Sequence, residues 1–454
     1  MRILLVLSGL FFSGCAAYQS YHSLPLSDPG IAQKLRRRSL NALEVDATQL
    51  HHPRLPPITL SFKHGIGPDQ AAVLAVLLSP KLVAERDRRG LAQAQLVQAG
   101  VLPNPSVGYT REFVTGGFTT GAFSPYGFTG SWDVSSLVSQ GAKVKAARAN
   151  VDAISLDVAW TEWQMAEGAK LEFYRVLALE TQLNRAKQID DDQQSTVTAL
   201  QSAVDHHEKS VVDLAAAQAA RQDSLAVVLA LQQELDQRRL ALRRAIGFLP
   251  AAQLPIQHDF ALPSSVSPPS EKELVGSLEN QRLDLIGLRQ GYQSQEETVR
   301  TAILAQFPKT TLGFIHASDN SNVHTTGFGI TFDLPIFDRN QGAIATEKAT
   351  RQKLYDEYTS RVFEARSDIA SALADIRSLN QQVSTAQAAL PVFQRLVETA
   401  KSASDEGATD VLSYFQARVN LNQRTLQILK LKQQLIEAKS ALELASGRYL
   451  TASN

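Results

Sequence analysis

The chain is poor in the residues that form cross-links and reactive sites. Among its 454 residues there is one cysteine, Cys15, so an internal disulfide is excluded. There is also no His-Glu-x-x-His motif, no phosphate-binding loop and no glycine-rich dinucleotide turn. We therefore predict a protein that is not an enzyme and has no catalytic residue, no metal site and no cofactor.

Charge and hydrophobicity exclude further classes. The 45 Lys and Arg residues balance 45 Asp and Glu residues, so no basic excess is present to neutralise a nucleic acid. Aromatic residues make up only 7%, which is typical of long helices rather than of aromatic-lined pockets. No later stretch reaches the roughly 18 consecutive apolar residues of a transmembrane helix. A secreted chain can still enter a membrane as a closed β-barrel.

The N-terminus has the pattern of a secretory signal. Arg2 is followed by a short apolar run that ends at Phe12, and small residues then precede Cys15. This segment resembles a bacterial lipobox, although Phe12 stands where leucine is usual. The resemblance implies cleavage after residues 1–14, lipidation of Cys15 and, from Ala16, sorting to the outer membrane. The alternative is an ordinary signal peptide with a chance cysteine.

Proline and glycine are nearly absent from two long stretches. Between Gly141 and Gly247 the only glycine is Gly168, and between Gly342 and Gly447 there is one glycine, Gly407. Both stretches are rich in Ala, Leu, Gln, Glu and Arg, which are strong helix formers. Each stretch therefore predicts about a hundred residues of helix.

The two halves of the chain align with each other. Trp132-Asp133-Val134 matches Phe332-Asp333-Leu334, and Ala245-Ile246-Gly247 matches Ala445-Ser446-Gly447, in each case 200 residues apart. We interpret this register as an internal duplication. The predicted domains are a signal peptide (1–14), a lipidated extended segment (15–67), a first helix-strand-strand-helix repeat (68–249), a Pro-rich linker (250–270) and a second repeat (271–454).

Each long helical stretch should fold back once, because one helix of a hundred residues would be about 150 Å long. Gly407 is the natural turn in the second repeat, and His207 is its equivalent in the first. We expect two antiparallel arms of about 50–65 residues that pack as coiled coils. The clearest heptad stripe consists of Leu431, Leu435, Ala438, Leu442 and Ala445.

Short alternating segments separate the helices. A period of two, with one apolar face and one small or polar face, is typical of membrane β-strands. Four such strands cannot close a barrel, whereas three chains would supply twelve, so we predict a trimer. Arg111 lies on the apolar face and is expected near the membrane interface. The apolar positions are Val107, Tyr109 and Phe113; Phe128, Gly130, Trp132 and Val134; Leu312 and Phe314; and Phe328, Ile330, Phe332 and Leu334.

Several motifs together resemble the TolC family of outer-membrane efflux factors. Gln98-Ala-Gly-Val-Leu-Pro-Asn-Pro105 is similar to that family's junction between a helix and the first strand. Arg282-Leu-Asp-Leu285 is similar to its Arg-Pro-Asp-Leu motif, with leucine in place of proline. Phe332-Asp-Leu-Pro-Ile-Phe-Asp-Arg-Asn-Gln-Gly342 resembles the junction of the last strand with the long helix.

The resemblance implies a mainly α fold with a membrane β-barrel. Three chains, with four strands each, would form a twelve-stranded outer-membrane barrel continued by a long α-helical coiled-coil periplasmic tunnel. The implied function is the exit duct of a tripartite efflux pump, with a periplasmic adaptor protein and an inner-membrane, proton-driven transporter as partners. The run that ends at Gly342, together with Leu390-Pro391, looks most like the heavy-metal and cation branch.

Two other functions stay open. The same duct could serve a type I protein secretion system. A protein of another class, a periplasmic coiled-coil scaffold or adaptor, would share the helices but not the paired apolar-faced strands.

The helical turns are the predicted gate. Asp405, Glu406 and Asp410 would form carboxylate rings in a trimer, with Arg395, Lys401 and Arg418 as candidate partners. The alternative is that these acids are solvated turn residues.

Two other groups of residues are candidates for function. Asp133 and Asp333 either line the lumen or cap the helices that follow them. The turn residues His206, His207, Glu208 and Gly407 are expected to contact the adaptor rather than to bind a metal.

Overall fold

The computed structural model describes residues 21–24, 26–35, 40–62, 65–117, 121–248, 255–258, 260–409 and 411–450. The chain forms two units, Met1–Leu43 and Glu44–Asn454. Helices α2 (Asp28–Leu35) and α3 (Leu40–Thr48) lie in the stretch 15–67, for which an extended conformation was predicted. The prolines do not prevent them, because Pro29 occupies the first turn of α2, where proline is tolerated, and α3 contains no proline.

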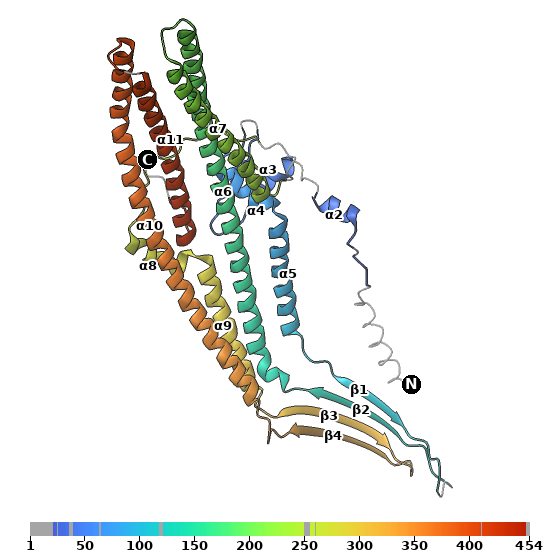
Figure 1. Ribbon diagram of the computed structural model, residues 1–454. Coiled ribbons are helices and arrows are strands. Elements are labelled where there is room, and N and C mark those ends of the chain that lie inside the picture. Colours follow the sequence, from blue (N-terminus) through green and yellow to red (C-terminus); the bar gives the residue numbers. More distant parts are fainter. Residues whose placement is uncertain are drawn as a thin grey trace. The chain divides into compact units, whose positions relative to one another are not determined.

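The second unit contains the duplication (Figure 1). Helices α7 and α11 have the same length, 36 residues, and begin 200 positions apart at Val211 and Val411. The first repeat consists of α4 (Pro68–Leu78), α5 (Pro80–Gly100), β1 (Ser106–Arg111), β2 (Tyr126–Asp133), α6 (Ser136–Asp205) and α7 (Val211–Ile246). The second consists of α8 (Glu271–Gln281), α9 (Leu283–Leu304), β3 (Lys309–Ser318), β4 (His324–Asp333), α10 (Gln341–Asp405) and α11 (Val411–Ser446).

The two arms of each helical hairpin are unequal, contrary to the predicted 50–65 residues for each. The outgoing helices α6 and α10 have 70 and 65 residues, so α6 is about 105 Å long, whereas the returning helices have 36. The difference arises because the strand-proximal parts of α6 and α10 pack against α5 and α9 instead (Figure 1). Among the described helices, none combines the length and the apolarity needed to cross a bilayer.

The four strands form one antiparallel sheet in the order β1-β2-β3-β4. Its register places Tyr109 opposite Phe128, and Phe314 opposite Phe328, so the predicted apolar positions share one face. This face is not covered within the chain, since Val107 is 75% and Phe328 87% exposed. The opposite face carries mainly Gly, Thr, Ser and Asp.

Each returning helix ends at a glycine. This glycine packs against the junction between two shorter helices. Gly247 has φ +87° and lies where an added Cβ would be 2.8 Å from the carbonyl oxygen of Leu78, at the end of α4. Gly447 has φ +69°, and its Cβ would lie 2.9–3.1 Å from atoms of Arg282, between α8 and α9. The same contact therefore occurs in both repeats, and only glycine fits it.

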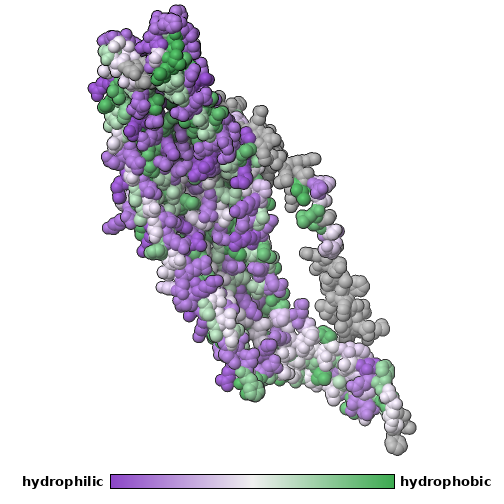
Figure 2. Space-filling view, in the orientation of Figure 1, coloured by the Kyte–Doolittle hydropathy of each residue, from purple (hydrophilic) through white to green (hydrophobic). Residues whose placement is uncertain are grey.

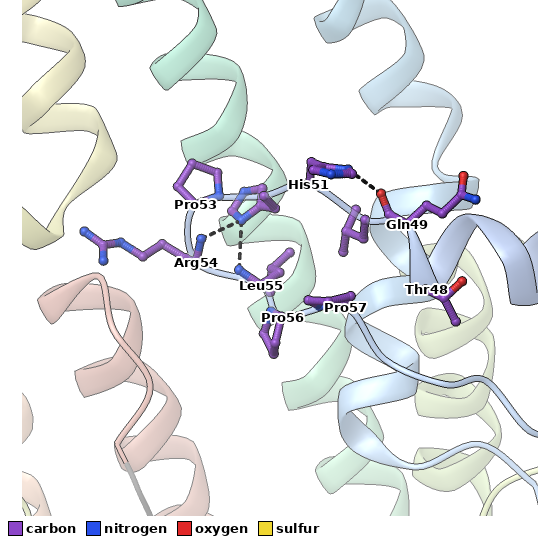
Figure 3. A pocket seen from close by; sticks show the side chains of 10 residues that line it. Thr48, Gln49, His51, Pro53, Arg54, Leu55, Pro56 and Pro57 are labelled. Atoms are coloured by element: carbon purple, nitrogen blue, oxygen red, sulfur yellow. Dashed lines mark hydrogen bonds between the residues drawn. The ribbon is translucent and has the colours of Figure 1, made fainter.

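A loop near the N-terminus is held against α6 by His52. Nδ1 of its ring accepts hydrogen bonds from the backbone N–H groups of Arg54 and Leu55, both at 3.0 Å (Figure 3). Its Nε2–H therefore donates to the carbonyl oxygen of Ala159, at 2.9 Å. Burial lowers the pKa of His52, and the neutral ring suits this bonding pattern. His52 is a structural residue here.

The same loop joins the two repeats. The guanidinium of Arg54 donates to the backbone carbonyls of Gln281 (3.0 Å) and Asn280 (2.9 Å) at the end of α8, and Figure 3 shows it extending away from the loop. Nearby, the buried carboxylate of Glu162 binds Arg86 at 2.6 Å and Arg89 at 3.3 Å. The loop thus connects elements far apart in the sequence.

The segment after α11 docks beside a buried carboxyl group. Tyr449 packs edge-on against Trp163, with ring centroids 4.7 Å apart, and Lys170 lies over its ring at 4.2 Å. Glu167 is 3% exposed, and its carboxyl group interacts with the Tyr449 hydroxyl and with Lys170. Burial raises the pKa of Glu167 to about 7, assisted by the nearby charge of Glu443 and opposed by Lys170.

The glycine contacts lead to a first prediction. Gly247→Ala should lower the free energy of unfolding by about 1–3 kcal/mol, because the new methyl group meets the backbone of Leu78 and φ is positive. Thermal unfolding in detergent measures the change. Gly276→Ala in α8 is the matched control: nothing lies within 4 Å of its Cβ position, and helix propensity predicts a gain of up to about 1 kcal/mol. Equal effects at both sites would contradict the contact.

The raised pKa of Glu167 predicts a pH-dependent stability. An unfolded chain ionises this carboxyl near pH 4.5, whereas the folded chain does so only near pH 7. The unfolded state therefore loses its proton first, and stability decreases as the pH rises from about 4.5 to 7. Glu167→Gln should melt at a higher temperature than the wild type at pH 8, with a smaller difference at pH 5. An unchanged difference between the two pH values would contradict this assignment.

Candidate functional site

The helical turns lie at the end of the molecule opposite the strands (Figure 1). His207 and Gly407 both adopt positive φ, +62° and +73°. The next residue in each repeat returns a hydrogen bond to the helix: Glu208 N–H donates to Ala203 and Ala408 N–H to Ala403, both at 2.8 Å. These are matching helix-ending turns, as the alignment predicted.

The charged residues predicted for the gate are largely exposed. Asp405 and Glu406 lie at the end of α10, and Arg395 and Lys401 lie on the same helix. Within the described residues none of the four makes a salt bridge closer than 4.0 Å. Asp410 lies outside the described residues. A role for these residues in a gate stays a prediction.

Arg418 binds a partner that the sequence did not indicate. Its Nη2 lies 3.2 Å from an Oδ atom of Asp192 on α6, and its Nη1 donates to the hydroxyl of Thr196 at 3.1 Å. Nη1 also donates to the Tyr414 hydroxyl at 3.3 Å. Among the described residues, the carboxylate that Arg418 meets is thus in the first repeat, rather than at the turn of its own hairpin. We call Asp192, Thr196, Tyr414 and Arg418 the tip network.

An apolar cluster lies next to the tip network. Phe415 on α11 packs with Leu200 on α6 and with Leu214 and Ala217 on α7, and all four side chains are buried. Tyr414 packs on this cluster too and so belongs to both groups. The two hairpins of one chain are therefore joined close to their tips by one polar and one apolar contact.

The tip network is suited to a contact that opens and closes. The Asp192 side chain is 60% exposed and that of Arg418 is 16% exposed, so water competes for the ion pair. Such a partly solvated pair contributes about 0.5–1 kcal/mol, which is small enough for a docking partner to outweigh. One feature of the sequence could have indicated the tip network. Arg418 aligns with Gln218, so the two repeats differ in charge at this position.

The aspartates at the strand ends have different environments. An Oδ atom of Asp133 accepts hydrogen bonds from the Ser135 hydroxyl and from the Ser135 N–H at 2.9 Å, just before α6 begins. These bonds reach Ser135, the residue before the first residue of α6, so Asp133 holds the junction between strand and helix, and capping of the helix stays a prediction. Asp133 and Asp333 also lie on the polar face of the sheet, opposite Thr311 and Lys309. The two roles are therefore compatible, and lining of a lumen stays a prediction.

The histidines of the first turn are exposed, and one of them bonds within its own helix. His206 Nδ1–H donates to the carbonyl oxygen of Ser202 at 2.7 Å. In the part of the chain that the structure describes, no group of three or more His, Cys, Asp or Glu residues could hold a metal. Cys15 and the signal peptide lie outside that part, so lipidation stays a prediction.

Part of the chain matches a known protein family. Residues 274–448, which correspond to the second repeat, match the model of the family described as outer membrane efflux protein. The match covers 175 of the 454 residues, which is less than half of the chain. This match confirms the resemblance drawn from the motifs, and its description is that of an efflux protein.

Curated relatives with sequence similarity are cation efflux proteins by name. The cation efflux system protein CusC of Escherichia coli strain K12 is 27% identical over 179 residues, which are 37% of this chain. CusC of the O6:H1 strain matches to the same extent. The matched region spans 39% of the length of these relatives.

Solved structures share the fold over nearly their whole length. A crystal structure of CusC has a TM-score of 0.72 at 18% identity and covers 88% of this chain and 98% of its own. VceC from Vibrio cholerae has a TM-score of 0.70 at 17% identity, with coverage of 84% and 96%. The outer-membrane channel OprN has a TM-score of 0.69 at 16% identity, with coverage of 95% and 98%.

The description of the matching family names the outer membrane, which is the location that the sequence predicted. The exposed apolar face of the sheet is the surface that suits a bilayer.

Proposed function

We propose that three copies of this chain form the exit duct of a tripartite efflux pump. The observation that carries the proposal is the four-stranded sheet, which has an exposed apolar face and two edge strands, β1 and β4. In lipid an unpaired edge is costly, because its N–H and C=O groups have no water to bind. Pairing β4 of one copy with β1 of the next would close twelve strands.

The polar face of the sheet would then line the lumen. Gly, Thr and Ser side chains are small and leave an open bore, and the helices α6, α7, α10 and α11 would continue it as a tunnel. Asp133 and Asp333 would contribute carboxylates at the point where the barrel meets the helices. A negative ring favours cations.

The tip network would hold the tunnel closed. It joins the two hairpins within each chain, so its loss would let one hairpin move away from the other. Three ion pairs of about 0.5–1 kcal/mol each amount to about 1.5–3 kcal/mol for a trimer, or roughly a ten- to hundred-fold change in the opening equilibrium. Contacts with a periplasmic adaptor at the exposed turns, including His206, His207, Glu208 and Gly407, would supply the opposing free energy.

Metal cations are the cargo that the comparisons favour, since the named curated relatives serve cation efflux. Small organic molecules are compatible with the same duct. Energy would come from an inner-membrane, proton-driven transporter joined through the adaptor. A periplasmic scaffold fits less well, because it would not present an apolar sheet face to its surroundings.

Adjacent residues on β4 test the assignment of the two faces. Ile330→Lys should cost about 2–4 kcal/mol in the assembled barrel and reduce the trimer recovered from outer membranes, because the new charge faces lipid. Thr331→Lys is the control on the other face, and it should leave the trimer intact while changing ion selectivity. Heat-modifiable trimer on gels and conductance in planar bilayers measure the two effects. A scaffold protein would tolerate both variants equally.

Charge exchange tests the tip network. Arg418→Asp and Asp192→Arg should each increase the conductance of purified trimers roughly ten- to hundred-fold, because each replaces the ion pair with two like charges. The double exchange should restore the closed state. Arg424→Ala is the control, since Arg424 contacts Gln427 and Phe393 within its own hairpin. Unchanged conductance in both single variants would refute a gating role.

A further inference from the structure

A cationic and aromatic group interrupts the apolar face at its hairpin end. Arg111 pairs with Tyr126 across β1 and β2, Tyr126 with Ser318, and Ser318 with His324 on β4. Directly opposed residues of an antiparallel sheet point to the same face, so this row shares the face of the apolar side chains. His316 lies two residues from Ser318 along β3, on the same face. We call Arg111, Tyr126, His316 and His324 the rim cluster.

Contacts within the rim cluster fix its two imidazoles. The Tyr126 hydroxyl lies 3.3 Å from Nδ1 of His324, and the Thr326 hydroxyl lies 2.8 Å from Nδ1 of His316. The two imidazole rings are nearly parallel, with an interplanar angle of 6° and centroids 6.3 Å apart. The Tyr126 ring is 6.1 Å from both of them.

This arrangement leaves hydrogen-bond donors unused. When the hydroxyls donate to Nδ1, each Nε2 carries the proton and is free to donate outward. In the described residues neither Nε2 has a hydrogen-bond partner, and Arg111 has no carboxylate within salt-bridge distance. Arg111 and His324 are exposed. The rim cluster therefore presents a guanidinium and two imidazole N–H groups, and among the described residues no carboxylate forms a salt bridge with the guanidinium.

The neighbouring residues indicate what lies beside these donors. Towards the helices the same face continues with Phe128, Phe314 and Phe328, which are 43%, 41% and 87% exposed. A ligand of the rim cluster must therefore be anionic and must lie at the border of an apolar phase. A soluble anion satisfies only the first condition, whereas a lipid headgroup satisfies both.

We propose that the rim cluster binds the phosphate groups of outer-leaflet lipid headgroups. The proposal rests on the proposed function, which places the hairpin loops at the external surface and the apolar face in the bilayer. Arg111 contributes a bidentate donor, the two imidazoles contribute single donors, and Tyr126 positions His324. Repeated on three copies, the rim cluster gives three headgroup sites around the barrel.

The test measures stabilisation of the purified trimer by lipid A, a phosphorylated glycolipid, added to detergent micelles. The melting temperature of the wild type should rise with lipid A and should not rise with dephosphorylated lipid A. The double variant Arg111→Gln/His324→Gln should need roughly tenfold more lipid A for half of the effect, because two charge-assisted hydrogen bonds are lost. Arg300→Gln/His51→Gln removes an exposed arginine and an exposed histidine outside the sheet, and it should behave as the wild type.

Three results would overturn the proposal: no rise with lipid A, an equal rise with dephosphorylated lipid A, or an equal rise with inorganic phosphate. The last would identify a free-anion site. Failure of the proposed function would be seen differently, as a wild-type protein that does not form trimers or conduct ions before any lipid is added.

Discussion

The unsatisfied backbone at the two edges of the sheet is the constraint on which the rest of the protein depends. Strands β1 and β4 each pair on one side only within the chain, while the sheet exposes an apolar face. Lipid rewards the apolar face but makes open edges costly, so the sheet is stable in a membrane only when it is closed. The requirement for neighbouring copies thus follows from hydrogen bonding, before any helix is considered.

The duplication then places the helices relative to the strands. Each repeat sends one long helix away from the sheet and returns with a shorter one, which ends on a left-handed glycine against a break between two further helices. Gly247 and Gly447 make equivalent contacts, although their partners differ, Leu78 in one and Arg282 in the other. Arg282 is held by a two-point ion pair with Asp284 and lies over Trp160, so the second contact is the more elaborate one.

Much of this fold could be predicted from local patterns. The period of two on the strands, the near absence of proline and glycine in the helices, and the 200-residue register each depend on neighbouring or aligned residues. The turns at His207 and Gly407 were predictable for the same reason. The exposed face and the sheet register then agreed with the alternation along each strand.

The sequence did not reveal contacts between distant residues. Arg418 and Thr196 are 222 positions apart, and no spacing rule connects Tyr414 to Asp192. The turn carboxylates were predicted as gate residues because they are close to one another in the sequence. The contacts of Arg418, in contrast, form only when the hairpins pack. The unequal arms could not be predicted for a similar reason. Helix propensity determines where a helix can form, but only the folded structure shows that parts of α6 and α10 pack against α5 and α9.

The length of α6 has a mechanical consequence. Its first residues follow strand β2, and its last turns carry Asp192 and Thr196, so the two ends lie about 80–100 Å apart on one continuous helix. A shift of a few ångströms at the tips requires only a slight tilt of so long a rod. In the proposed trimer, the strands could therefore stay hydrogen-bonded while the tips separate, so that membrane integrity would not depend on the state of the proposed gate.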